Sequence, residues 1–447
     1  MFTRSYGLVP DERGERLLLL RGSGGWEVPN RETSEPRWWH VVDDVNAGFG
    51  GLLGLDVTTL RCLANREVDD DLRLRFYELE AHGPASPPRG AAWVDRADLE
   101  RVELAEPEHR PLLLRCLDER ADDGGRLRIP WARPGWLAGA VDWIRERLAE
   151  RGLEPSAVVQ ERTWSISTVL RASTGAGDVY FKAVGRAFTA EPALTRALAR
   201  RHPESVPAVH AVDEERGWML MDDIGGEALW DDTAPRTLAS ALRGYAALQC
   251  AWLGRGDDLL ALGCPDRTLD VLRARIDPLL GDRELLLPGR TGGLSETELD
   301  AIPALAERLH ADCERLAAYQ VPPTLDHGDF HTDNVRARDE AFVFFDWSDA
   351  CLSVPFFSLV PFFDFRDEPL EPAVRARLRD AYLEPFAKRV PAAGLVEAFE
   401  LALFIGLFHQ AISYHRLTEH TEPRARWEWE RGFPYFVKQL LEGSADA

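Results

Sequence analysis

The sequence predicts an α+β protein in which a small α/β domain precedes a larger α+β domain. Its 447 residues suffice for two or three domains of ordinary size. Strand-like runs such as 72–77 and 177–183 stand beside 138–151, where apolar residues recur at helical spacing. A stretch rich in Gly, Pro and charge, 122–136, marks a boundary. We therefore expect a first domain at 1–122, a linker at 123–137, and two further parts at 138–225 and 226–447.

Several runs in the first 120 residues follow one another in a recognisable order, and 72–77 among them is strand-like. The apolar runs 16–21 and 25–29 come first, and 52–57, 72–77 and 92–99 follow in order. This order resembles that of a Nudix domain, and the resemblance implies a Nudix-like α/β fold. Another small α+β domain remains open as an alternative.

The metal-binding glutamates of a Nudix hydrolase are missing from this chain. Such enzymes place an Arg-Glu-x-x-Glu-Glu-x-Gly cluster on one helix, because several carboxylates on one face bind magnesium. If Gly54 is the closing glycine, the functional positions carry Ala47, Gly48, Gly51 and Leu52, with Trp39 upstream. Asp43 and Asp44 lie nearby, but two adjacent residues cannot share a helix face. We expect a Nudix-like helix ending near Gly54, weakened by its glycines and without hydrolase chemistry.

Residues 163–191 place a strand-borne lysine before a helix-borne glutamate. The segment 177–183 is typical of a turn followed by a strand that ends in Lys182. Glu191 begins a helical run, with Pro192 suited to its first turn. Just upstream, Ser165 and Ser167 lie in a stretch without a Gly-x-Gly-x-x-Gly pattern, where small side chains would let the backbone approach phosphates.

The run 325–334 and the segment 344–347 contain the most informative motif. Asp329 is followed by Asn334 and, after an apolar strand-like run, by Asp346. Phosphoryl transfer to a hydroxyl uses one carboxylate to orient the acceptor and take its proton, while an amide and a second carboxylate hold magnesium. His327 and His331 stand in the same loop, and we expect both to support it. A polar turn between two strands is the alternative reading of the motif.

This His-Gly-Asp and Asp-Trp form resembles the aminoglycoside phosphotransferase and choline kinase-like family, small-molecule relatives of protein kinases. The resemblance implies a two-lobed protein-kinase-like fold, with 138–225 as the N-terminal lobe and 226–447 as the C-terminal lobe. It implies that Lys182 contacts the phosphates of ATP (or GTP), that Glu191 positions Lys182, and that Mg²⁺ is the cofactor. It also implies a nucleotide-binding hinge at Met221, Asp222, Asp223 and Ile224. One departure is Ser358, where relatives often carry Asp.

Composition narrows the range of partners. The net charge of −22 and the sequence pI near 5.0 disfavour binding to nucleic acid and to anionic lipid. We find no signal peptide and no apolar run near the roughly 20 residues needed to cross a bilayer, so we expect no membrane partner. The six scattered cysteines indicate free thiols in a reducing, cytoplasmic compartment. The oligomeric state stays open.

The C-terminal third is expected to be mostly helical and to hold the acceptor. His409, His415 and the aromatic and acidic residues at 427–430 are candidates for a wall that receives a cationic amine, although core packing is favoured for each. We therefore predict an ATP-dependent phosphotransferase acting on a hydroxyl of an aminoglycoside-, choline- or sugar-like molecule. A regulatory protein that binds nucleotide without catalysis is the alternative.

Overall fold

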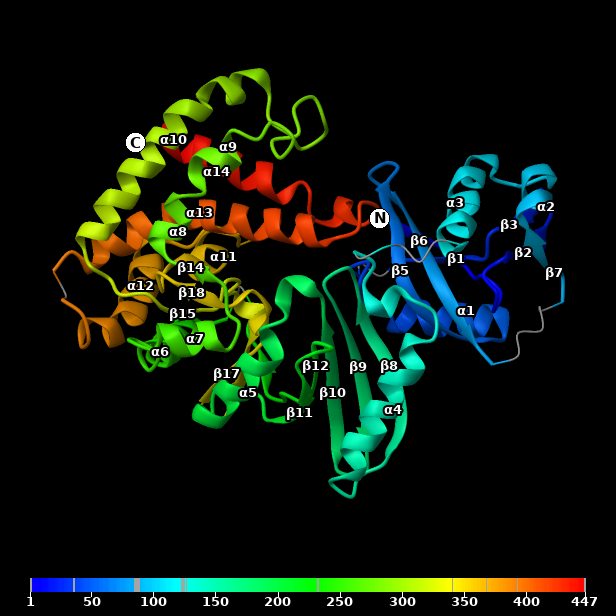
Figure 1. The fold of residues 1–447 in the computed structure, drawn as a ribbon, viewed down its shortest axis with the longest axis horizontal. Coiled ribbons are helices and arrows are strands. Elements are labelled where there is room, and N and C mark those ends of the chain that lie inside the picture. Colours follow the sequence, from blue (N-terminus) through cyan, green and yellow to red (C-terminus); the bar gives the residue numbers. More distant parts are fainter. Residues whose placement is uncertain are drawn as a thin grey trace. The chain divides into compact units, whose positions relative to one another are not determined.

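The computed structural model describes residues 2–34, 37–83, 89–121, 125, 127–230, 233–339, 341–366, 368–391 and 393–445. The chain forms two compact units (Figure 1). Unit 1 comprises residues 1–185 together with 420–426, and unit 2 comprises 186–419 together with 427–447. The finer division into an N-terminal domain, a linker and two lobes stays a prediction.

The N-terminal part of unit 1 contains two small sheets and three α-helices. The first sheet has the order β4-β1-β6-β5, in which β1 and β6 run parallel, and the second has the order β3-β2-β7. Its core includes Tyr6, whose ring stacks on Phe76 with centroids 4.7 Å apart. The elements are β1 (Phe2–Leu8), β2 (Arg16–Gly22), β3 (Gly25–Glu27), β4 (Asn30–Thr33), α1 (Asp43–Leu53), β5 (Asp56–Glu67), β6 (Leu72–His82), β7 (Ala91–Asp95), α2 (Arg96–Arg101), η1 (Pro107–His109) and α3 (Arg110–Ala121).

Helix α1 ends where the sequence predicts. Gly54 follows it with φ 64°, a left-handed conformation that glycine adopts at low cost, and its N–H bonds to the Gly50 carbonyl. The helix spans 11 residues despite its internal glycines. Its acidic residues, Asp43 and Asp44, lie in the first turn, and each pairs with Arg37 at 3.1 Å.

The second half of unit 1 is an antiparallel sheet with a helix against it. It contains η2 (Pro130–Ala132), α4 (Trp136–Ala149), β8 (Pro155–Thr163), β9 (Ser167–Thr174) and β10 (Gly177–Val184). The predicted helix at 138–151 is thus confirmed. Trp143 of α4 packs edge to face on Phe181 of β10, with ring centroids 5.6 Å apart.

A buried glutamine joins the two halves of unit 1. The side-chain amide of Gln160 on β8 donates to the Thr59 carbonyl at 2.9 Å and accepts from the Thr59 N–H at 3.0 Å. Its oxygen also accepts a bond from the Asn46 amide of α1 at 3.0 Å. These bonds mimic a strand pairing between β5 and β8, so the N-terminal part is fixed to the sheet that carries Lys182.

The segment 420–426 belongs to unit 1 through a buried network of charges. Arg61 pairs with Glu78 and Glu119, each at 2.7 Å, and with Glu422 at 2.8 Å. Arg128 adds positive charge beside Glu119 and Glu422, at 3.6 and 3.5 Å. Because every carboxylate has a cationic partner, the charges can be buried together.

Unit 2 is mainly helical and carries two three-stranded sheets, with orders β13-β16-β17 and β14-β18-β15. Large aromatic side chains such as Tyr245, Phe330 and Trp347 fill its core, and α6 packs along α12 (Figure 1). Its elements are η3 (Arg186–Phe188), α5 (Glu191–Arg201), β11 (Val209–Asp213), β12 (Trp218–Asp222), β13 (Glu227–Ala228), α6 (Pro235–Cys250), α7 (Gly256–Ala261), β14 (Asp266–Arg267), α8 (Leu269–Arg273), α9 (Ile276–Leu280), α10 (Glu296–Ala318), β15 (Thr324–Asp326), η4 (Thr332–Asn334), β16 (Val335–Arg338), β17 (Ala341–Phe344), η5 (Trp347–Asp349), β18 (Cys351–Ser353), η6 (Phe357–Leu359), α11 (Val360–Asp364), α12 (Pro372–Ala387), α13 (Leu395–His420), η7 (Arg426–Glu428) and α14 (Gly432–Ala445).

Helix α13 is long and apolar enough to cross a membrane by length and composition alone, which the sequence analysis did not anticipate. The structure nevertheless buries 61% of its most apolar window. A helix that is apolar on most sides is expected in the core of a large helical unit, and α13 contributes Phe399, Ile405 and Phe408 to that core.

Candidate active site

The loop that carries Asp329 begins where β15 ends. His327, the first loop residue, is fully buried, and its backbone N–H donates to the Tyr245 hydroxyl at 3.0 Å. Its Nε2 lies 2.9 Å from the Phe345 carbonyl, one residue before Asp346. Burial lowers the pKa of His327, so a neutral ring with a proton on Nε2 fits this bond. The imidazole thus ties the start of the loop to the segment that follows β17.

Gly328 occupies a position that tolerates no side chain. Its φ is +83°, and a Cβ there would fall 2.2 Å from the Asp349 carbonyl oxygen. The Gly328 carbonyl accepts a bond from the Gln410 amide of α13 at 2.7 Å. The turn that presents Asp329 is therefore held on both sides by buried groups.

Asn334 folds the loop back on Asp329. Its amide nitrogen donates to the Asp329 carbonyl at 3.0 Å and lies 3.1 Å from Nε2 of His331. The same Nε2 lies 3.5 Å from the Asp329 carboxylate. Asp329 itself is exposed, with 53% of its side chain accessible, so its carboxylate is open to a substrate.

The carboxylates around His331 raise the pKa of its imidazole. Burial lowers the pKa of His331, but the hydrogen bond and charge of Asp329 and the charges of Asp333 and Asp346 outweigh burial and raise it. A protonated His331 would place a positive charge 3.5 Å from the Asp329 carboxylate.

A hairpin brings Asp346 beside Asn334. Strands β16 and β17 pair antiparallel with Val335 opposite Phe344, and the Phe345 N–H donates to the Asn334 carbonyl at 3.2 Å. Asp346 follows directly, with φ 61° and ψ 58°, a conformation that costs a residue other than glycine some strain. The Ser348 hydroxyl donates to its Oδ1 at 2.8 Å. Asp329, Asn334 and Asp346 are thus brought together by one loop and one hairpin.

Unit 2 also holds Glu191 and the predicted hinge. Glu191 is 1% exposed at the start of α5, and α5 packs against η5, directly after Asp346. Met221 and Asp222 end β12, and Asp222 bonds to His210. Asp223 accepts a bond from the Gly225 N–H at 3.1 Å, and Ile224 lies half-buried between them.

The hinge segment lies against the hairpin that carries Asn334. Gly226 has φ 75°, and a Cβ there would fall 2.4 Å from the Ala337 carbonyl oxygen. Beyond it, β13 pairs with β16, with Glu227 opposite Ala337. Glycine is therefore required for this close approach of two backbones.

Lys182, Ser165 and Ser167 lie in unit 1. Lys182 stands opposite Val169 in the β9–β10 pair and is 6% exposed. Because side chains alternate along a strand and Phe181 faces α4, Lys182 points to the other face of the sheet. Ser165 is buried in the turn between β8 and β9, and the Ser167 hydroxyl accepts a bond from the Trp164 indole at 2.7 Å.

Two buried groups near the loop were not predicted from the sequence. Arg267 on β14 pairs with Asp349 at 3.0 Å and donates to Ser413 on α13 at 2.6 Å. Asp326, Cys351 and His409 form a second group. Each group joins residues at least 25 positions apart, and no local pattern marks such a pairing.

The chain matches the model of the phosphotransferase enzyme family (APH) over residues 163–394, just over half its length. No curated protein matches it.

Three similar solved structures show the range of relatives. The gentamicin complex of APH(2")-IIa is 14% identical, covers 68% of this chain and 96% of its own, and has a TM-score of 0.48. Choline kinase LicA from Streptococcus pneumoniae is 13% identical, with coverages of 68% and 99% and a TM-score of 0.46. Choline kinase from Cryptosporidium parvum is 14% identical, with coverages of 69% and 97% and a TM-score of 0.44. On the family match, this chain belongs to the phosphotransferase enzyme family.

Proposed function

We propose that this protein transfers the γ-phosphoryl group of ATP to a hydroxyl group of a small molecule. The observation that carries the proposal is the joined placement of Asp329, Asn334 and Asp346, in which Asn334 bonds to the Asp329 carbonyl at 3.0 Å and to the Phe345 N–H at 3.2 Å. Family membership supports the same reaction class. GTP is the alternative donor.

In this proposal, Asp329 orients the acceptor hydroxyl and takes its proton. Its exposed carboxylate suits that role. His327 supports the loop through its bonds to Tyr245 and to the Phe345 carbonyl. In-line attack on the γ-phosphorus then needs the acceptor oxygen and the phosphoryl group held in one geometry, which the rigid loop provides.

Asn334 and Asp346 fit the donor set for Mg²⁺. The Asn334 amide nitrogen donates to the Asp329 carbonyl at 3.0 Å, and we propose the Asn334 amide oxygen and the Asp346 carboxylate as the oxygen ligands. Oxygen donors of this kind are those that magnesium prefers. When bound, magnesium would neutralise charge on the phosphates.

Lys182 is proposed to contact the phosphates, with Glu191 as the residue that positions it. Membership of the phosphotransferase enzyme family supports this assignment. Ser165 and Ser167 would cover the phosphates, and residues 221–224 would offer backbone groups to the base. Free thiols at all six cysteines fit a reducing, cytoplasmic location.

The test is a screen of alcohols, amino sugars and quaternary amines for acceptor-dependent ADP release, with mass spectrometry of the phosphorylated product. Asp329→Asn should reduce turnover about 10²–10⁴-fold while nucleotide affinity stays near normal. The matched control is Asp333→Asn, because Asp333 is an exposed carboxylate of the same loop, 67% accessible. Nucleotide binding without product on any acceptor would favour the regulatory alternative.

The structure reduces the set of residues that could bind the acceptor. His409 is fully buried and Trp429 is 7% exposed, so neither side chain is open to an acceptor. Glu430 pairs with Arg290 at 3.1 Å. These contacts leave the identity of the acceptor to the screen.

We also propose that residues 1–122 are a Nudix-like domain without hydrolase activity. The course of α1 and the parallel pairing of β1 and β6 support this. At Gly48, a glutamate position of the hydrolases, a Cβ would fall 2.1 Å from the Arg31 guanidinium, so a side chain there would have to displace Arg31. The intact protein should release no product from nucleoside diphosphate compounds with Mg²⁺. Hydrolysis that is lost in Asp43→Asn would contradict this proposal.

A further inference from the structure

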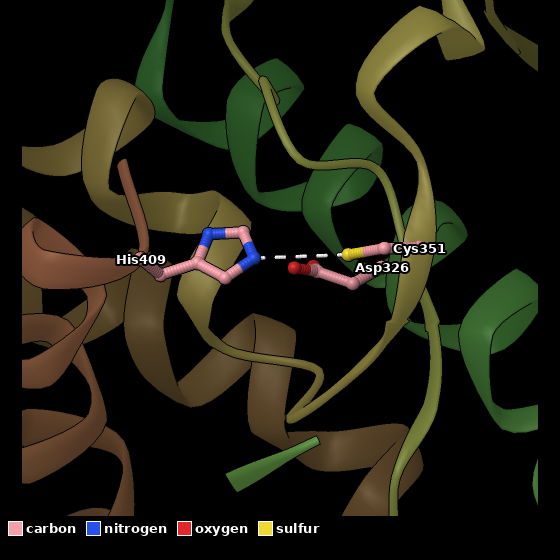
Figure 2. A group of neighbouring side chains, drawn as sticks. All are labelled: Asp326, Cys351 and His409. Carbon is pink, nitrogen blue, oxygen red and sulfur yellow. Dashed lines mark hydrogen bonds between the residues drawn. The ribbon is translucent and has the colours of Figure 1, made fainter. Parts of the chain in front are cut away.

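Three potential metal ligands, Asp326, Cys351 and His409, meet in the core of unit 2. Asp326 on β15 and Cys351 on β18 are cross-strand partners in the antiparallel register, and α13 brings His409 to them. One ligand atom from each lies within 4.8 Å of the other two, and His409 Nε2 is 3.7 Å from Cys351 Sγ. Figure 2 shows the Asp326 carboxylate turned toward the space between the imidazole and the thiol.

Asp326 is a buried carboxyl group without an adequate partner. It is 0% exposed, and within the described residues neither of its oxygens makes a hydrogen bond of normal geometry. The Ser358 hydroxyl and backbone N–H both lie near enough to lower its pKa. Burial prevails and raises the pKa of Asp326 to about 8. Buried polar groups are rarely left in this state, so the site calls for a ligand.

We propose that Asp326, Cys351 and His409 bind a zinc ion. Thiolate, imidazole and carboxylate together form a donor set typical of Zn²⁺, whereas Mg²⁺ and Ca²⁺ take oxygen ligands. Three protein ligands leave one tetrahedral position for a water molecule or a neighbouring hydroxyl.

Charge balance favours a divalent ion at this place. Zinc binding would displace one proton from the Asp326 carboxyl and one from the Cys351 thiol, while burial keeps the His409 imidazole neutral. Zn²⁺ with one carboxylate and one thiolate carries no net charge, which suits a dry core. The nearby cation, Arg267, is neutralised by Asp349 at 3.0 Å and therefore opposes the ion only weakly.

The position of the site gives the ion a structural role. Asp326 immediately precedes the His327–Asp329 turn, and Gln410, next to His409, already holds the Gly328 carbonyl at 2.7 Å. Zinc would join β15, β18 and α13 at one point and fix the base of the loop. This role does not depend on which acceptor the enzyme uses, and it would hold even if the protein had no kinase activity.

The experiment measures metal in the intact purified protein. After incubation with zinc and removal of free metal, mass spectrometry of metals should find one zinc per chain. Cys351→Ser and Asp326→Asn should each lose it, whereas Cys313→Ser should retain it. Cys313 on α10 is the matched control because it is also a free, buried thiol, 1% exposed, outside the cluster.

Cobalt provides a second readout that needs no variant. Co²⁺ bound at the site should show a thiolate-to-cobalt charge-transfer absorption band, and added Zn²⁺ should abolish it. If Cys351→Ser does not fold, this titration of the wild-type protein still shows whether a thiolate binds the metal. Wild-type protein that holds no more zinc than Asp326→Asn, or that shows no charge-transfer band with Co²⁺, would overturn the proposal.

Discussion

Replacing Gly328 with alanine tests whether the backbone of the Asp329 loop must be glycine. Alanine at φ +83° costs about 1–2 kcal/mol from the backbone alone. Its Cβ would lie 2.2 Å from the Asp349 carbonyl oxygen, whereas ordinary contact begins at 3.4 Å. The loop or η5 must therefore move by roughly 1 Å, and a shift of that size can reduce turnover about 10²-fold. Overpacking adds about 1–3 kcal/mol of lost stability.

The matched control is Gly254→Ala. Gly254 lies in the same unit with φ 73°, and a Cβ there would meet nothing within 4 Å. Gly254→Ala should lose only the stability that the positive φ costs an alanine, about 1–2 kcal/mol, and its turnover should not fall. Urea unfolding measures stability, and ADP release with the identified acceptor measures turnover. Equal losses in the two variants would refute the argument that the contact with Asp349 shapes the loop.

Three further predictions follow from buried or coupled groups. Asp349→Asn should destabilise the protein by about 3–5 kcal/mol in urea unfolding, because Arg267 would be left as a buried charge without its anion; a loss below about 1 kcal/mol, the scale of an exposed pair, would contradict this. Gln160→Leu should cost about 1–3 kcal/mol and expose the N-terminal part to limited proteolysis, because the Thr59 backbone groups lose their bonds; an unchanged digestion pattern would argue against this link. The pKa of His331, measured by NMR titration, should lie above 6.5 and should fall in Asp329→Asn. The stability that protonated His331 provides is complete below pH 6.5 and is lost as the pH rises through the folded-state pKa of His331. An unchanged pKa of His331 in Asp329→Asn would show that Asp329 does not raise it.

The sequence alone predicted the elements whose signals are local. The strand that bears Lys182, the helix that begins at Glu191 and the end of α1 at Gly54 all lie where the pattern of apolar residues, Pro and Gly placed them. The free state of the cysteines also followed from their spacing. Such signals depend on the conformational preferences of neighbouring residues, which the sequence displays directly.

The spacing of the loop motif also carried three-dimensional information. Because Asn334 and Asp346 flank two short strands, a hairpin necessarily brings them together, and the structure contains that hairpin. Their roles in metal binding and catalysis stay predictions until the variants are measured. The apolar character of α13, by contrast, forms no continuous run in the sequence, because polar residues such as Gln410 and Ser413 interrupt it and bond to buried groups.

Only the tertiary structure decided which distant residues meet. The bond of Gln160 to Thr59, the pair of Arg267 with Asp349 and the cluster of Asp326, Cys351 and His409 each join segments far apart in the chain. A buried polar side chain is acceptable only where folding supplies its partner, and the identity of that partner depends on sheet register and helix packing. Sheet register and helix packing depend on the whole core, so no single segment of the sequence predicts them.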